Sequence, residues 1–289
     1  MADFRKWLRI VLTEEFRVKS LFLWFSSPEL FAESPWFPPS LFIIYRLVIT
    51  AWSVIITVES TFATPSYLWL LQLDNWSISL SCLYFVLATF LLIYYAVKTC
   101  KSEENKEIPK KTEKSYFAED ERENESELLW TANEEDELHR ELPRREERLP
   151  CYHAVLWVLQ TLVGNSILVV ILCYVTLEEQ FNVLEFAKFL SITIFMVAEA
   201  IFSFAPIRLL HFIYSYVFSL TYVLVVLMYY FVFVDERVSE LPSFVNRIDD
   251  PLSSTVVFMI LIVGQPLFQL LYFTVHKLNC YVYVKYFSY

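Results

Sequence analysis

The chain has 289 residues, of which 56% are hydrophobic, 18% aromatic and 19% charged, and its mean hydropathy is +0.44. Soluble domains are roughly 45–50% apolar and about a quarter charged, so this composition excludes an ordinary soluble domain and indicates a multi-pass membrane protein. The two glycines, Gly164 and Gly264, are too few for a glycine-rich phosphate loop. A net charge of −10 without a basic stripe excludes a nucleic-acid partner.

The charged residues are concentrated in one segment. Ten Lys/Arg and seventeen Asp/Glu, almost half of all charged residues, fall within residues 101–150, together with only three aromatic residues. A segment of this composition cannot bury enough apolar surface to fold by itself. We therefore expect an acidic, largely disordered loop over 99–150, on the cytosolic side, that serves as a docking segment for cytosolic proteins.

Six stretches are long and apolar enough for a helix that crosses the hydrocarbon core, which takes about 20 residues. They predict an all-α fold: a six-transmembrane helix bundle with an amphipathic N-terminal helix and the disordered cytosolic loop. The chain then divides into an interfacial N-terminal segment 1–36, spans one and two within 37–98, the loop 99–150, spans three to six within 151–276 and a tail 277–289. The spans are 40–60, 76–98, 153–176, 183–205, 208–234 and 252–276.

The distribution of Lys and Arg predicts the orientation. With a cytosolic N-terminus, nineteen of these residues lie inside and only two outside. Both termini are therefore expected in the cytosol. We expect the chain in the plasma membrane, or alternatively in an endomembrane, with membrane lipids as its partners. Apolar residues at helical spacing within the first 25 residues predict an amphipathic helix that lies on the membrane surface or is docked on the bundle.

Four polar residues near the cytosolic ends of three spans form a candidate site. Arg46 and Glu199 each lie six residues from a cytosolic span end, which is about 9 Å deep. An ionisable group at this depth needs a partner, so we expect an interhelical ion pair that Arg208 and His211 are close enough to join. The pair either fixes the packing of spans one, four and five or forms a polar site for a lipid head group or substrate.

The other reactive side chains form no recognisable catalytic or metal-binding motif. No HxxH or HExxH spacing and no CxxC occur, and we predict no metal, cofactor or catalytic residue. Cys100 and Cys151 flank the acidic loop beside the membrane and are either acylated or unmodified thiols. Glu185 and Lys188 are three residues apart in span four and are expected to pair with each other.

Several short motifs, here called landmarks, occur in a definite order along the chain. Spans four and five are joined by Pro206, Arg208, Leu209, Leu210 and His211. The landmarks before them are Ser34-Pro35-Trp36, Tyr45-Arg46 and Leu73-Asp74-Asn75-Trp76, and those after them are Ile248-Asp249-Asp250-Pro251, Pro266 and His276. In order and spacing these landmarks resemble the rolling stone family of multi-pass membrane proteins over nearly the whole chain except 101–150.

The resemblance implies a non-enzymatic protein that acts in membrane organisation, cell contact or cell fusion, because the founding member is associated with fusion of muscle precursor cells. A distant similarity to the androgen-induced six-pass lipid hydrolases implies the alternative of a fatty-acid ester hydrolase or a lipid-binding protein. Those hydrolases use a Thr and a His, whereas this chain has Asp74 at the first position and no His in 183–205. Thr50 and Asp74 remain as hydrolase candidates, and a small transporter or channel is a further alternative.

Overall fold

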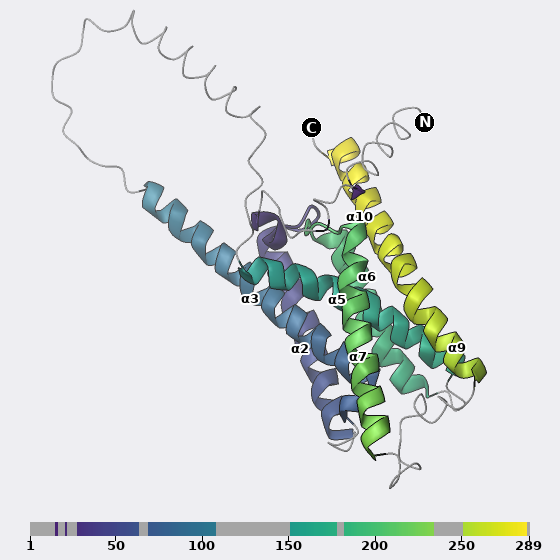
Figure 1. Ribbon diagram of the computed structural model, residues 1–289. Helices are drawn as coiled ribbons and strands as arrows, with labels where there is room; N and C mark the ends of the chain where they lie inside the picture. The colour runs from purple at the N-terminus through teal and green to yellow at the C-terminus, as the bar shows by residue number, and fades with distance from the viewer. Residues whose placement is uncertain are drawn as a thin grey trace, which may run out of the picture.

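The computed structural model describes residues 15–16, 21, 28–63, 69–107, 151–177, 182–233 and 251–287. Within these residues the structure is helical and contains no strand (Figure 1), which confirms the predicted all-α class. The longer helices are α2 (Pro39–Ala63), α3 (Leu73–Glu107), α5 (Cys151–Leu177), α6 (Val183–Phe202), α7 (Phe212–Phe233), α9 (Pro251–Met259) and α10 (Gln265–Phe287). Short helical segments are η2 (Pro28–Ala32), η3 (Trp69–Leu71), η4 (Leu209–His211) and the π-helical η6 (Ile260–Gly264).

Five helical stretches among the described residues are long and apolar enough to cross a membrane. They are Pro39–Ala63, Leu73–Lys101, Cys151–Thr176, Leu209–Tyr229 and Thr255–Tyr283, and each contains most of one predicted span. The remaining predicted span, 183–205, forms α6, whose 20 residues include the charged Glu185, Lys188 and Glu199. The five long apolar helices agree with the predicted spans, because about 20 apolar residues suffice to cross a membrane.

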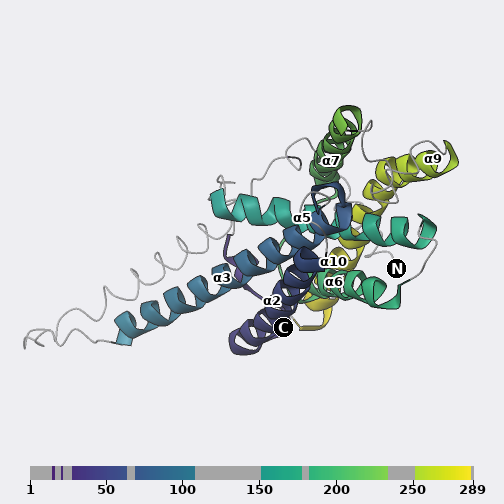
Figure 2. The ribbon, with the colours of Figure 1, turned by 90° about the horizontal axis from the view of Figure 1, so that it is seen from below.

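Helix α5 is the centre of the bundle. Of its most apolar stretch 67% is buried, against 28–39% in the other four candidate spans. It contacts α3, α6, α7 and α10, and the two views show it among these helices (Figures 1 and 2). This agrees with its sequence, which contains no Asp, Glu, Lys or Arg and has no predominantly polar face, as expected for a helix surrounded by others.

The outer helices present apolar side chains to their surroundings. On α2 the exposed residues include Leu41, Ile44, Val48, Ile55 and Phe62. Similar residues are exposed on α3 and α7, among them Phe90, Val217 and Met228. Exposed apolar surface of this extent is unfavourable in water, and it matches a hydrocarbon environment.

The inward face of α2 explains how this helix packs. Phe42, Arg46, Ile49, Ser53 and Ile56 are buried. Their spacing of three and four residues places them on one side of the helix. This face packs against α3 and α6 and carries Arg46 into the interior.

The last span changes its hydrogen-bonding pattern in the middle. The π-helical turn η6 separates α9 from α10 and ends immediately before Gln265 and Pro266. Pro266 has no backbone N–H for the carbonyl four residues earlier, that of Ile262. The Tyr216 hydroxyl of α7 donates a hydrogen bond to this carbonyl, so a neighbouring helix supplies the missing donor, as a membrane interior requires.

Three features differ from, or add to, the sequence predictions. Helix α3 continues to Glu107 and α10 to Phe287, beyond the predicted span ends at 98 and 276; the rest of the acidic segment, 108–150, lies outside the described residues.

Glu15, in the predicted amphipathic segment, is buried against the bundle, where a carboxylate oxygen accepts from the Leu209 N–H at 3.3 Å. At this residue the segment is docked on the bundle, while residues 1–14 are not described.

The predicted Glu185–Lys188 pair is wrong. The Lys188 Nζ lies 2.6 Å from Oε1 of Glu59 on α2. Both ends of this ion pair are partly exposed. Because α2 and α6 are in contact, the long lysine side chain reaches a carboxylate on the neighbouring helix in place of the one three residues away on its own.

Candidate functional site

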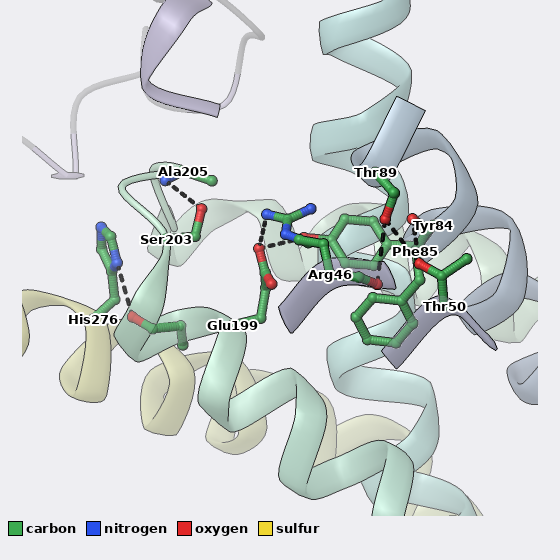
Figure 3. Close-up of polar contacts among 10 residues, drawn as sticks. Arg46, Thr50, Tyr84, Phe85, Thr89, Glu199, Ser203, Ala205 and His276 are labelled. Atoms are coloured by element: carbon green, nitrogen blue, oxygen red, sulfur yellow. Dashed lines mark hydrogen bonds and ion pairs between the residues drawn. The ribbon is translucent and has the colours of Figure 1, made fainter. Parts of the chain in front are cut away.

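A buried ion pair joins α2 to α6. Nη2 of Arg46 donates to Oε1 of Glu199 (Figure 3), and the two side chains are 1% and 0% exposed. The expected interhelical pair is therefore present. Removing two charges from water costs several kcal/mol per ion, and a close, well-aligned partner offsets much of this cost. Either charge can therefore be buried only because the other lies beside it.

Aromatic and hydroxyl groups surround the ion pair. The Tyr84 hydroxyl of α3 donates to the same Glu199 oxygen at 3.3 Å. The Arg46 guanidinium lies 4.9 Å from the centre of the Phe42 ring, a cation–π distance. Three helices thus meet at one carboxylate, and the surrounding groups supply packing and hydrogen bonds.

Not every polar atom of the pair is satisfied. Among the described residues, Nε and Nη1 of Arg46 have no hydrogen-bond partner. The nearby hydroxyl of Tyr45 is also buried without one. A guanidinium has hydrogen-bond donors and no acceptor, so these two nitrogens can bind only an acceptor. The pair is therefore suited to holding helices together.

Arg208 and His211 form a second group around Trp157 of α5. The Trp157 Nε1–H donates to the Pro206 carbonyl, the Arg208 guanidinium lies 5.4 Å from the Trp157 ring, and the His211 ring packs edge-on at 4.7 Å. These contacts link the α6–α7 connection to the central helix. Of the four residues predicted to cluster, the structure brings Arg46 and Glu199 together and places Arg208 and His211 against Trp157.

The two hydrolase candidates lie apart. The Thr50 hydroxyl donates to the Phe85 carbonyl at 3.1 Å and lies 2.8 Å from the Thr89 hydroxyl (Figure 3). Asp74 is in the first turn of α3, eleven residues before Phe85, which is about 16 Å along the helix. A nucleophile requires a base within hydrogen-bond reach. Thr50 and Asp74 do not form such a pair.

Other landmark residues tie the connections between helices. Asn75 is 1% exposed, accepts from the Ser60 hydroxyl of α2, and donates to Gln72 Oε1 at 2.7 Å. The Trp36 Nε1–H donates to Oδ1 of Asn279 on α10 at 3.0 Å. Each of these residues joins separate segments of the chain, which is a structural role.

A seam of uncharged polar residues crosses the interior and was not predicted. Asn165 of α5 donates to the Ser215 hydroxyl of α7 at 2.8 Å and to Gln269 Oε1 of α10 at 2.9 Å. One turn away along α7 and α10, the Gln265 amide donates to the Ser219 hydroxyl. The sequence signal was present: Gln265 and Gln269 are four residues apart in an otherwise apolar span, and so are Ser215 and Ser219, which places each pair on one helix face.

Among the described residues, the free cysteines are not part of a cluster that could hold a metal ion. Cys100 and Cys151 are exposed free thiols at the two ends of the acidic segment. Cys280 lies 3.7 Å from Nε2 of His276, whose Nδ1 is 3.3 Å from the Ala200 carbonyl. Within the described residues no group of three or more His, Cys, Asp or Glu is placed to hold a metal ion.

A comparison of the chain with known protein families, curated proteins and solved structures finds no significant match. The fold itself therefore defines the class. Helices of this length and hydropathy, packed around an interior that holds a paired Arg and Glu, are those of an all-helical integral membrane protein.

Proposed function

We propose that this chain is a six-span membrane protein without catalytic activity, similar to the rolling stone family, that acts in membrane organisation, cell contact or cell fusion. The observation that carries the proposal is what the landmark residues do. Arg46, Asn75 and the group around Trp157 form contacts between helices. Landmarks of this kind support a shared architecture more than a reaction centre.

The sixth crossing in this proposal is α6. Its 20 residues would extend about 30 Å, the thickness of the hydrocarbon core. Two of its three charged side chains are paired, Glu199 with Arg46 and Lys188 with Glu59, while Glu185 is in the first turn, near the membrane surface. An even number of crossings agrees with two cytosolic termini and with nineteen Lys/Arg inside against two outside.

The candidate residues of the hydrolase alternative support it poorly. Thr50 on α2 is engaged with Phe85 and Thr89 of α3, and Asp74 lies eleven residues before Phe85 on α3. A hydrolase-directed activity probe applied to intact membranes tests this alternative. Labelling that disappears in Thr50→Val at equal expression would overturn the non-enzymatic proposal.

A cell-mixing assay tests the proposed role directly. Two populations that express the chain, each with half of a split fluorescent reporter, are mixed with each other and with non-expressing cells. We expect more contacts or fused cells when at least one population expresses the chain at the surface. Cells that express a Glu199→Arg variant provide a control for a chain whose buried pair is broken. Equal contact and fusion counts with and without surface-expressed chain would contradict the proposal.

A further inference from the structure

A small cavity lies in the interior between α5, α6 and α10, beside the polar seam. It has room for a single water molecule. Its lining comes from α5, from Met196 of α6, from Ile207 in the α6–α7 connection and from α10; the α5 and α10 members are Gln160, Thr161, Gly164, Gln269 and Tyr272. The cavity therefore lies where the central helix meets the last span.

The Tyr272 hydroxyl is the observation that points to an occupant. Tyr272 is 5% exposed, lines the cavity, and its hydroxyl has no hydrogen-bond partner among the described residues. A buried hydroxyl without a partner is costly in an apolar interior. Gly164 allows this position, because a Cβ there would lie 3.1 Å from the Tyr272 ring. The close contact between helices brings the hydroxyl to α5 without giving it a partner.

The other polar groups of the cavity complete a set of donors and acceptors. Gln160 is 6% exposed and supplies an amide with both functions. The Thr161 hydroxyl donates to the Trp157 carbonyl at 3.3 Å, so its oxygen can still accept. A buried water typically makes about three hydrogen bonds to such groups. Tyr272, Gln160 and Thr161 provide that number.

The seam holds this side of the cavity in place. Gln269 accepts from Asn165 at 2.9 Å and donates to the Arg208 carbonyl at 2.6 Å. Both ends of its amide are thus engaged, and its side chain forms a fixed wall between α5 and α10. None of the seven residues that line the cavity is charged, and Arg46 and Glu199 are not among them, so the site is neutral and suits an uncharged molecule.

We propose that this cavity binds one water molecule, which bridges the Tyr272 hydroxyl of α10 to Gln160 and Thr161 of α5. Water matches both the size of the cavity and its mixed donors and acceptors. The bridge adds a polar link between the central helix and α10 on the cytosolic side of the η6 π-turn. The water site is independent of the proposed role in cell contact or fusion.

Thermal unfolding of the full chain in detergent tests the bridge. If the water is bound, Tyr272→Phe removes one of its partners and lowers the unfolding midpoint, by about 2–4 °C. The same substitution in a Gln160→Leu background should have a smaller effect, because the two side chains are coupled through the water. In a dry cavity, Tyr272→Phe removes an unsatisfied hydroxyl and is neutral or stabilising, which would overturn the proposal.

A matched control and a direct measurement make the test independent of folding defects. The Tyr222 hydroxyl donates directly to the Leu71 carbonyl at 2.8 Å, so Tyr222→Phe should be destabilising to the same extent with or without Gln160→Leu. A density map of the unmodified protein that resolves ordered water should show a peak about 2.6–3.2 Å from the Tyr272 hydroxyl oxygen. A well-resolved Tyr272 with no peak beside it would overturn the proposal even if the variants fail to fold.

Discussion

The Tyr216 hydroxyl on α7 donates to the carbonyl of Ile262, the residue whose helical donor is replaced by Pro266. Proline in a helix interior normally costs about 3 kcal/mol, partly through the lost hydrogen bond. Here a tyrosine on the adjacent helix supplies the donor. The π-turn in the last span is thereby compatible with the membrane interior. The free-energy cost of Pro266 then depends on Tyr216, a residue of a different span.

Tyr216→Phe should therefore destabilise the bundle by about 1 kcal/mol, because the Ile262 carbonyl loses its donor. In a Pro266→Ala background the penalty should shrink, since an alanine at that position would restore a backbone N–H near the carbonyl. Unfolding midpoints of the four proteins in one detergent measure this coupling. Equal penalties in both backgrounds would show that the hydroxyl does not compensate for the proline.

Charge reversal tests the Arg46–Glu199 pair. Arg46→Glu or Glu199→Arg alone should reduce the folded yield strongly, because breaking a buried pair costs about 3–5 kcal/mol. The double reversal should restore part of the yield. The partly exposed Lys188–Glu59 pair is the control, and Lys188→Glu should cost about 1 kcal/mol or less. A double reversal as poorly folded as the single variants would argue against pairing.

Trp157→Phe should loosen the connection between α6 and α7. The substitution leaves the Pro206 carbonyl without its indole donor and weakens the stacking of the Arg208 guanidinium. We expect a loss of about 1–3 kcal/mol in the free energy of unfolding. Trp52→Phe is the matched control: that indole donates to the Ser191 hydroxyl but is 45% exposed, so its loss should be smaller. Equal losses would show that the Trp157 contacts add nothing specific.

The orientation can be measured through the exposed thiols at the ends of the acidic segment. With that segment in the cytosol, Cys100 and Cys151 should react with a membrane-impermeant maleimide only after cells are permeabilised. Hydroxylamine treatment beforehand frees any acylated thiol. A cysteine introduced at Val238, between the last two predicted spans, should be labelled in intact cells. Labelling of Cys100 or Cys151 in intact cells would overturn the proposed topology.

The acidic segment is expected to bind cytosolic proteins without supporting the fold. Replacing 108–150, which lies outside the described residues, by a flexible polar linker of equal length should leave the unfolding midpoint unchanged. Crosslinking of cells before purification should then recover fewer cytosolic proteins than the unmodified chain does. An unaltered set of crosslinked partners would contradict the docking role.

Much of the architecture follows from the sequence because membrane insertion depends on local composition. A run of about 20 apolar residues forms a helix wherever lipid offers no other hydrogen-bond partner, and five described helices coincide with predicted spans. The Arg46–Glu199 pair could also be predicted from the sequence, because depth along a span follows from residue number. Two opposite charges buried at one depth are expected to pair.

Only the tertiary structure decided which side chains meet across helices. Lys188 pairs with Glu59 and not with Glu185, Arg208 and His211 lie against Trp157, and Tyr216 serves the Ile262 carbonyl. These contacts depend on the rotation and crossing of each helix, which the packing of all its neighbours sets together. Apolar side chains face both the interior and the surroundings of this bundle, so the apolar pattern locates the helices, whereas the polar partner of each residue is a property of the assembled bundle.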